Sequence, residues 1–274
     1  MISIIIPSRN ALALNRISEN ISKTIGVPFE IIDYDNTDDG FGICKIYNVC
    51  AAKAICSYLV FCHDDIEFCS HDWGKVLLKI LGETTIGIVG VTGATFKSKY
   101  PAPWVSIPQK HYRCQLTNNF PDNESDYEEV AVLDGCFMAM RKQVWEEFKW
   151  NDRQIPDFHL YDIDISERVF RNYRLVVAKN LSVNHRSEGN FDEIWFKQSK
   201  NYFEINSNKF PITVERMSPK YEDYLNAYSI KSLLFRRGRI NLSIFEVLTY
   251  SIQILINYPK IFSFGLLKNI IKPK

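Results

Sequence analysis

The stretch Tyr58-Leu-Val-Phe-Cys-His-Asp-Asp-Ile-Glu67 is an apolar run that ends in one histidine and two adjacent carboxylates. Its first five residues have the composition of a strand that is buried on both faces of a parallel sheet. Sheets built from alternating strands and helices bind ligands beyond the carboxyl ends of their strands. The stretch therefore predicts a strand that brings His63, Asp64 and Asp65 to a ligand-binding edge.

The segments around this strand alternate between strand and helix patterns. The first expected helix carries Ile17, Ile21 and Ile25 on one face, with Asn15 as its N-cap and Gly26 as its stop. Such alternation favours right-handed β-α-β units, so the predicted fold class is α/β with a mainly parallel central sheet flanked by helices. The other expected elements are strands at residues 2–6, 29–34, 58–62, 86–91, 130–141 and 174–177 and helices at residues 43–54, 73–81, 163–171 and 189–206.

The composition is that of an ordinary folded protein of 274 residues, with 46% hydrophobic and 24% charged residues. A net charge of +1 argues against a general nucleic-acid binder, which usually carries a strong basic excess. The seven cysteines form no Cys-x-x-Cys pair, so we interpret them as small buried side chains in a reducing compartment. The first residues lack a basic leader, and no uninterrupted apolar run is long enough to cross a membrane. We therefore expect a cytoplasmic protein.

The charge is concentrated at the carboxyl end. Residues 231–274 hold eight Lys or Arg and one acidic residue, a net +7, which leaves −6 for the remainder of a chain that carries +1. Arg236-Arg237-Gly238-Arg239 leads into an apolar segment at 244–256. This pattern is typical of attachment to an anionic membrane surface. It is equally compatible with a helix pair that packs on the protein or on a second subunit, and both readings stay open.

Three further polar clusters follow apolar segments. They are Leu133-Asp-Gly-Cys-Phe-Met-Ala-Met-Arg141, Phe158-His-Leu-Tyr-Asp-Ile-Asp164 and Val183-Asn-His-Arg-Ser-Glu-Gly189. Adjacent acids can also be a solvated turn or a helix cap, and a lone histidine can be a surface residue. In the second cluster, Asp162 and Asp164 are two positions apart, so on a helix their side chains point about 200° from each other. Only one of them can face a site; Asp164 could instead neutralise the helix N-terminus.

In this order the residues resemble the GT-A type glycosyltransferases, in particular glycosyltransferase family 2, over roughly residues 1–200. Two positions depart from the family pattern: His63 replaces the first Asp of Asp-x-Asp, and Tyr161 replaces the Glu that precedes the base. The matching elements are Ile4-Ile-Ile-Pro-Ser-Arg-Asn10, Asp35-Asn36, Tyr47-Asn48, the His-Asp-Asp cluster, Asp134-Gly135 with Phe137-Met-Ala, Tyr161-Asp162 and His185.

The resemblance implies a role for each matching position. Asp162 would be the catalytic base, and Asp65 with His185 would bind Mn²⁺ or Mg²⁺. Asp134 and Gly135 would contact the acceptor. The residues that would bind the nucleotide-sugar donor are Pro7 and Ser8 at the nucleobase, Asp35 at the base or ribose, and His63 and Asp64 near ribose and phosphate, with Lys45 offsetting phosphate charge or merely solvated.

The implied organisation is a GT-A catalytic domain at 1–210, with a nucleotide-sugar-binding half at 1–95 and an acceptor half at 96–210. Residues 211–274 would form a basic, apolar helical appendage. The implied function is metal-dependent, inverting transfer of a sugar to a glycan or lipid-linked glycan hydroxyl in bacterial surface polysaccharide synthesis. The protein would be cytoplasmic or peripheral on the inner face of the plasma membrane, and its oligomeric state is open.

Two other functions compete with this interpretation. A sugar-1-phosphate nucleotidyltransferase also uses a parallel sheet and a metal, but it needs a glycine-rich phosphate loop after the first strand. Pro7-Ser-Arg-Asn10 contains no glycine. A non-catalytic glycan-binding protein on the same fold is the second alternative, and the histidine at position 63 keeps it open.

Overall fold

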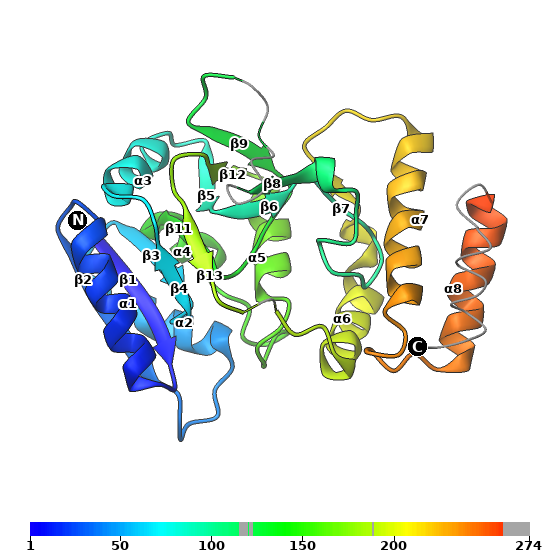
Figure 1. Cartoon of the computed structure of the whole chain (residues 1–274), viewed down its shortest axis with the longest axis horizontal. Coiled ribbons are helices and arrows are strands. Elements are labelled where there is room, and N and C mark those ends of the chain that lie inside the picture. Colours follow the sequence, from blue (N-terminus) through cyan, green and yellow to red (C-terminus); the bar gives the residue numbers. More distant parts are fainter. Residues whose placement is uncertain (115–119, 121–122, 188, 260–274) are drawn as a thin grey trace. The chain divides into compact units, whose positions relative to one another are not determined.

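A computed structural model describes residues 1–114, 120, 123–187 and 189–259 of the chain (Figure 1). The chain forms two compact units. The first comprises Met1–Thr95 and Arg113–Glu188, and the second comprises Phe96–Tyr112 and Gly189–Lys274. The functional division at residue 210 stays a prediction.

A seven-stranded sheet of order β2-β1-β3-β11-β5-β12-β9 forms the centre of the first unit (Figure 1). β1 is parallel to β2 and β3, and β12 is parallel to β5. β11 is antiparallel to both of its neighbours and β9 is antiparallel to β12. The sheet is therefore mixed but largely parallel, which confirms the predicted α/β class. The strands are β1 (Ile2–Ser8), β2 (Phe29–Asp35), β3 (Tyr58–Cys62), β5 (Ile86–Gly90), β9 (Tyr127–Val130), β11 (Phe137–Arg141) and β12 (Arg174–Ala178).

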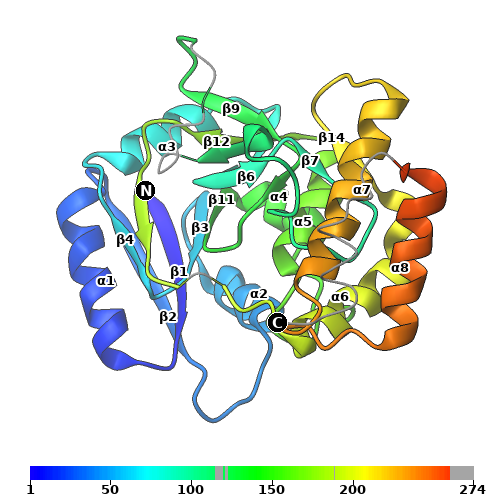
Figure 2. The ribbon, with the colours of Figure 1, turned by 45° about the vertical axis from the view of Figure 1, so that its right-hand side comes forward.

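Helices cover both faces of this sheet (Figures 1 and 2). On one face the apolar sides of α1 and α3 enter one core with alternate residues of β1 and β3. On the other face Tyr47 of α2 packs on Phe61, and Trp150 and Tyr161 complete the aromatic cluster. The helices of this unit are α1 (Ala11–Thr24), α2 (Ile43–Lys53), α3 (Trp73–Leu81), α4 (Lys142–Phe148) and α5 (Tyr161–Phe170).

The start of α1 differs from the prediction. Asn10, not Asn15, is the N-cap, and its side chain accepts hydrogen bonds from the N–H groups of Leu12 and Ala13. Asn10 has extended backbone geometry directly after β1, so its side chain can reach back to the first helical turn. Asn15 lies inside the helix, whose buried face carries Ile17 and Ile21 as predicted.

The predicted strand at 130–141 is wrong as a single element. It is divided into the end of β9, the short β10 (Val132–Leu133) and β11. The break follows from Asp134, whose side chain accepts a hydrogen bond from Cys136 N at 2.9 Å and closes a turn. β10 joins a small sheet of order β10-β6-β8, in which β6 is Thr92–Ala94 and β8 is Tyr112–Cys114.

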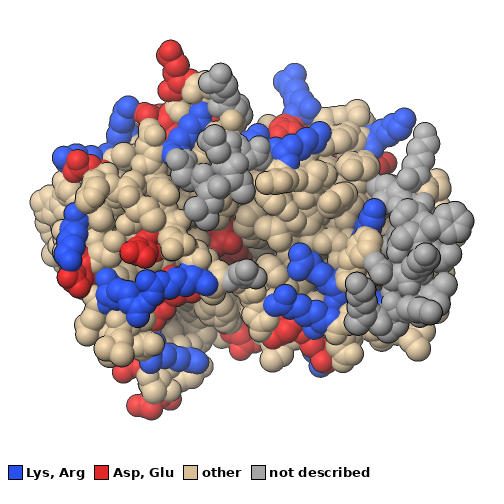
Figure 3. Space-filling view, in the orientation of Figure 1, with Lys and Arg blue, Asp and Glu red and all other residues tan. Residues whose placement is uncertain are grey.

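The second unit is mostly helical. Its apolar contacts include Val247 and Ile254 of α8, which pack with Ile230 and Leu234 of α7. Within the described residues, no helix combines the length and the apolarity that crossing a bilayer requires. On the face drawn in Figure 3, basic and acidic side chains are interspersed. The elements are β7 (Phe96–Lys97), η1 (Gln109–His111), α6 (Glu193–Asn206), η3 (Ser207–Lys209), β14 (Ile212–Thr213), α7 (Pro219–Phe235) and α8 (Ile244–Asn257).

Candidate functional site

The first three strands end side by side at one edge of the sheet. Ser8, the last residue of β1, is in register with Asp35, the last residue of β2. Its hydroxyl donates a hydrogen bond to Asp64 Oδ2 at 2.5 Å, just beyond the end of β3. The structure therefore brings these three predicted donor-binding residues to the same edge, as a parallel arrangement requires.

A short antiparallel strand pair brings the predicted metal ligands together. β4 (Ile66–Phe68) pairs with β13 (Val183–His185), so that His185 lies opposite Ile66 (Figure 1). The backbone N–H of Arg186 donates to the carbonyl of Asp65 at 3.2 Å. As a result His185 Nε2 lies 3.2 Å from Asp65 Oδ1, although the two residues are far apart in the sequence.

His63 joins this pair. Its Nδ1 lies 3.9 Å from Asp65 Oδ1, and its Nε2 lies 2.6 Å from the hydroxyl oxygen of Tyr161. One ligand atom from each of His63, Asp65 and His185 lies within 4.8 Å of the others. The same limit holds for a second set, which shares His185 with Asp134 and Cys136.

The charges in the cluster depend on one another. The contact with the His185 imidazole lowers the pKa of Asp65 to about 2, against the opposing effect of burial. Burial disfavours the imidazolium of His185, but Asp65 and the charge of Asp134 outweigh it and raise the His185 pKa. Burial lowers the pKa of His63, which favours its neutral form. Neutral imidazole is the form that can bind a metal.

These residues fit a divalent cation. Asp65 Oδ1 is buried, and apart from its contact with His185 Nε2 at 3.2 Å it has no hydrogen-bond partner among the described residues. A buried carboxylate oxygen with unused acceptor capacity costs free energy unless a cation or another partner fills it. One carboxylate and two imidazoles form a common ligand set for first-row metal ions.

Asp162 and Asp164 have different surroundings on α5, as their spacing predicts. Asp162 is half-buried, and burial together with the negative charge of Asp134 raises its pKa to about 7. Hydrogen bonds from the backbone, including one from Ile163 N at 2.9 Å, oppose the rise. Asp164 is buried and forms an ion pair with Arg168 at 2.7 Å. Asp164 is therefore neutralised by Arg168, and the role of Asp162 in proton transfer stays a prediction.

The turn before β11 also contacts the cluster of His63, Asp65 and His185. The backbone N–H of His63 donates to the carbonyl of Cys136 at 3.1 Å. A Cβ on Gly135 would overlap the hydroxyl end of Tyr161, so this position has no room for a side chain. Tyr161 thus occupies the space beside Gly135, and the acceptor contact predicted for Asp134 and Gly135 stays a prediction.

The remaining predicted donor residues lie at the rim. Asp35 is exposed, and its carboxylate accepts hydrogen bonds from Thr37, which lower its pKa. Pro7 is half-buried within β1. Lys45 is exposed and its Nζ lies 3.4 Å from the centroid of the Phe41 ring, so the described contacts do not bring it to the cluster.

Two residues of the site were not predicted as members. Tyr161 is the hydrogen-bond partner of His63, and Ser187 Oγ lies 3.0 Å from His185 Nε2. The only sequence signal for Tyr161 is its departure from the family pattern. Ser187 follows His185 by two residues, but its spacing alone indicates no role.

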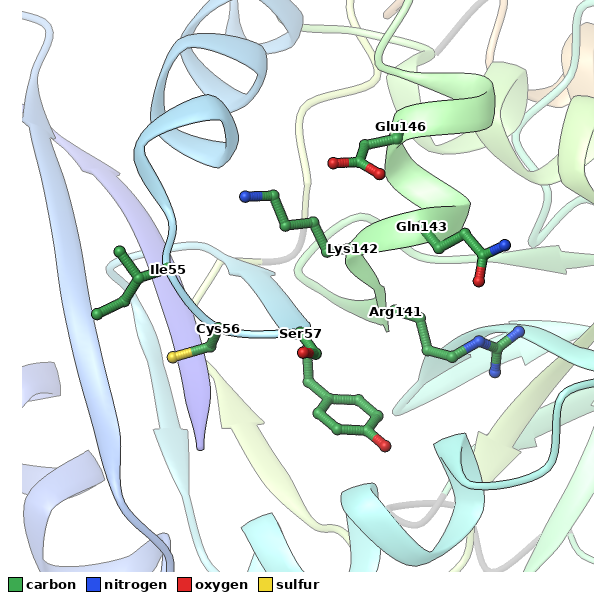
Figure 4. A pocket seen from close by; sticks show the side chains of 8 residues that line it. Ile55, Cys56, Ser57, Arg141, Lys142, Gln143 and Glu146 are labelled. Atoms are coloured by element: carbon green, nitrogen blue, oxygen red, sulfur yellow. The ribbon is translucent and has the colours of Figure 1, made fainter.

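A pocket at the opposite edge of the sheet is a poor alternative site (Figure 4). It lies between the start of β3 and the start of α4, and Arg141 and Lys142 line it. Arg141 donates to the carbonyls of Leu81, Glu83 and Thr84, and Lys142 Nζ donates to the carbonyl of Ala54. Backbone oxygens therefore occupy donors of both basic side chains.

Known proteins resemble this chain in family and in fold. Residues 4–209 match the glycosyltransferase-like family. No curated protein sequence matches the chain. The structure of GalNAc-T7 with UDP, GalNAc and Mn²⁺ is similar with a TM-score of 0.55 and 13% identity, over 94% of this chain and 58% of that one. The structure of S. aureus TarS 1-349 gives a TM-score of 0.52 and 12% identity, over 98% of this chain and 80% of that one.

At these identities the similar structures show the fold, and this chain spans just over half the length of GalNAc-T7. The family match extends over most of the chain and includes every predicted site residue. The chain therefore belongs to the glycosyltransferase-like family, and it has the GT-A fold.

Proposed function

We propose that the protein is a metal-dependent, inverting glycosyltransferase that uses a nucleotide-diphosphate sugar. The observation that supports this most strongly is Asp162, whose pKa is raised to about 7 by burial and by Asp134. A general base is most effective when its pKa is near the working pH. Asp162 directly follows Tyr161, whose hydroxyl contacts His63, a member of the candidate cation site of His63, Asp65 and His185. The proposed base and the proposed diphosphate site thus belong to one compact unit.

The proposed reaction is a single displacement. The acceptor hydroxyl oxygen attacks the anomeric carbon from the face opposite the diphosphate, and Asp162 takes the hydroxyl proton. The new carbon–oxygen bond forms as the bond from the anomeric carbon to the diphosphate oxygen breaks. The nucleotide diphosphate leaves with the bonding electron pair, and the configuration at the anomeric carbon is inverted.

The edge formed by β1, β2 and β3 is the proposed donor site. The hydrogen bond from Ser8 orients Asp64, and Asp35 lies on the neighbouring strand. Asp65 and His185 would hold the cation, which when bound supplies positive charge that offsets the charge of the diphosphate. GalNAc-T7 has been crystallised with UDP and Mn²⁺ and TarS with UDP-GlcNAc, which supports a nucleotide sugar as the donor here.

The proposed acceptor is a hydroxyl of a glycan or a lipid-linked glycan, as in bacterial surface polysaccharide synthesis. We propose Asp134 as the residue that orients it, because the charge of Asp134 raises the pKa of Asp162, the proposed base. Neither alternative function has a comparable supporting observation. A nucleotidyltransferase would need a phosphate loop after β1, where this chain has Pro7-Ser-Arg-Asn10, and a binding protein would not need a base.

The test is transfer itself. The full chain is incubated with a panel of nucleotide-diphosphate sugars and Mn²⁺, and released nucleotide diphosphate is measured with and without candidate acceptors. We expect one donor to be consumed, and NMR of the product to show inverted anomeric configuration. Retained configuration would contradict the displacement mechanism. Release of pyrophosphate in a parallel reaction with a nucleoside triphosphate and a sugar-1-phosphate would indicate a nucleotidyltransferase.

We propose in addition that α8 binds an anionic membrane surface. Six large apolar residues of this helix are each at least 52% exposed. At 3.6 residues per turn they lie within an arc of about 120°, beside the buried face that packs on α7. The exposed residues are Ile244, Phe245, Leu248, Ile252, Leu255 and Ile256.

Basic residues near the exposed apolar face of α8 favour an anionic membrane as its binding partner. Arg236, Arg237 and Arg239 lie in the connection that leads to α8. The other basic residues after α8, which contribute to the predicted +7 segment, lie outside the described residues. An apolar helix face beside clustered arginines matches the acyl region and the negative headgroups of an anionic bilayer.

Vesicle co-sedimentation tests this proposal. We expect binding to vesicles that contain an anionic lipid, weakened but not abolished by high salt, because each basic residue adds about 1 kcal/mol of screened attraction. Replacing Leu248 and Ile252 by Glu should remove the salt-resistant part. If wild type does not bind vesicles but these variants convert a dimer to a monomer, the face is a subunit interface.

A further inference from the structure

The two positions that depart from the family pattern contact each other. The resemblance to glycosyltransferase family 2 implies an aspartate at position 63 and a glutamate at position 161, where this chain has His63 and Tyr161, and 98 positions separate the two residues in the sequence. In the structure His63 Nε2 lies 2.6 Å from the Tyr161 hydroxyl oxygen. These two residues therefore form one contact at the edge of the candidate cation site of His63, Asp65 and His185.

The contact with Tyr161 uses Nε2 of His63, so the second ring nitrogen, Nδ1, remains for the cluster of Asp65 and His185. Nδ1 lies 3.9 Å from Asp65 Oδ1, and His185 Nε2 lies 3.2 Å from the same oxygen. Ligands bound at about 2.1 Å to one metal ion lie about 3 to 4 Å from each other when they occupy neighbouring positions. Both distances agree with a shared ion.

The tautomer of His63 connects the contact of Nε2 with Tyr161 to the position of Nδ1 near Asp65. A neutral imidazole carries its proton on one nitrogen only, so Nδ1 can bind a metal only when Nε2 is the protonated nitrogen. The Tyr161 hydroxyl is within hydrogen-bond distance of Nε2 and can accept that proton's hydrogen bond. Metal-bound histidines usually donate their second N–H to such a partner, which sets both the tautomer and the ring orientation.

The position of Tyr161 is itself well determined. The residue is buried, and its ring packs at 6.0 Å from Tyr47 and 5.7 Å from Trp150, measured between centroids. Gly135 provides the space for the hydroxyl end, since a side chain there would overlap it. The partner of His63 is thus held by the core and not by a mobile surface contact.

We infer that His63 is a third protein ligand of the cation, bound through Nδ1 and oriented by Tyr161, and that this ligand set makes the site prefer a transition-metal ion to Mg²⁺. The inference rests on the proposed function, which places the cation at Asp65 and His185. Imidazole nitrogen binds first-row transition metals well, whereas Mg²⁺ prefers oxygen ligands and keeps its waters. With two imidazole nitrogens and one carboxylate as ligands, we expect the affinity to rise from Mg²⁺ to Mn²⁺ to Co²⁺.

Metal titration of the full, metal-free chain without nucleotide tests the ligand set. Calorimetry with Mn²⁺, Co²⁺ and Mg²⁺ should show at least tenfold tighter binding of Mn²⁺ than of Mg²⁺. His63→Ala should weaken Mn²⁺ binding by at least about tenfold and change Mg²⁺ binding much less. His63→Asp should reduce the preference for Mn²⁺, because it replaces nitrogen by oxygen. His71→Ala, at an exposed histidine, is the control for adventitious binding.

The orienting role of Tyr161 is tested by a double-mutant cycle. Tyr161→Phe should weaken Mn²⁺ binding about tenfold in the wild type and have no further effect in His63→Ala. Tyr47→Phe removes a buried hydroxyl from the same aromatic cluster, and that hydroxyl has no hydrogen-bond partner among the described residues. This control should leave Mn²⁺ affinity unchanged. Circular dichroism confirms that each variant is folded.

Pulsed EPR of bound Mn²⁺ gives a readout that does not depend on affinity. Nitrogen couplings from two imidazoles are expected in the wild type, and from one in His63→Ala. Unchanged couplings and affinity in His63→Ala would overturn the inference. So would a loss of Mn²⁺ binding in Cys136→Ser together with normal binding in His63→Ala, because the ion would then occupy the second ligand set.

The failure of the inference and of the proposed function can be told apart. If Mn²⁺ binds through His63 but no nucleotide sugar is consumed, the ligand set stands and the proposed function fails. If a sugar is transferred in the presence of Mn²⁺ while His63→Ala leaves metal affinity and couplings unchanged, the function stands and the inference fails.

Discussion

The two ends of β3 differ in what their charged neighbours contact. At the carboxyl end, the buried Oδ1 of Asp65 lies 3.2 Å from His185 Nε2 and has no further hydrogen-bond partner among the described residues, and the pKa of Asp162 is raised to about 7. At the other end, beside Tyr58, the basic side chains of Arg141 and Lys142 donate to backbone carbonyls. Both ends are polar, but only the first holds groups whose bonding capacity is left for a ligand. Unsatisfied chemistry, more than the presence of a pocket, therefore locates the site.

The largest expected effect separates the two aspartates of α5. Asp162→Asn keeps the shape of the side chain but cannot accept a proton, so turnover should fall by about two to four orders of magnitude with donor binding intact. The measurement is steady-state transfer together with calorimetric donor affinity. Asp164→Asn is the matched control: it should lower the melting temperature by weakening the ion pair with Arg168 and keep turnover per folded molecule. The reverse pattern would show that Asp164 is the base.

Removal of the cation tests the role proposed for the carboxyl end of β3. Nucleotide diphosphate should bind at least about tenfold more tightly with Mn²⁺ than in EDTA, because the cation offsets phosphate charge. Asp65→Ala should abolish this difference, whereas Arg141→Ala at the other end should preserve it. Calorimetry measures both affinities. Equal affinity in Mn²⁺ and EDTA for the wild type would contradict a cation at the diphosphate.

The pH dependence follows from the raised pKa of Asp162. Below pH about 7 the carboxyl is protonated and cannot act as a base, so kcat/KM should fall about tenfold for each pH unit below that value. Above pH 7 the carboxylate predominates and the rate should level off. A pH–rate profile in saturating Mn²⁺ measures this limb. A flat profile between pH 5 and 8 would exclude a base with this pKa.

The smallest expected effect lies at the opposite end of β3. Arg141→Ala removes charge-assisted hydrogen bonds to three carbonyls and should lower the free energy of unfolding by about 1–3 kcal/mol. Turnover per folded molecule should not change. Urea unfolding monitored by circular dichroism gives the free energy. If stability is unaffected while donor affinity falls, the pocket of Figure 4 belongs to the substrate site.

Much of the fold and part of the site followed from local patterns. The strands at 2–8, 29–35 and 58–62 were predicted to within two residues at each end. Each is a short apolar run bounded by polar turn residues, a pattern that adjacent residues in the sequence define by themselves. The errors have local causes as well: the cap of α1 is five residues earlier than expected, and a turn at Asp134 divides a predicted strand. The roles of the site residues stay predictions.

The sequence by itself determined the α/β class, the family and the placement of His63, Asp64 and Asp65 at the end of a buried strand, since strand length and turn chemistry are encoded within a few residues. Only the tertiary structure decided which distant residues meet them. Pairing of β4 with β13 brings His185 to Asp65, and packing in the aromatic core brings Tyr161 to His63. Such contacts depend on strand register and core packing across the whole sheet, and no local pattern contains that information.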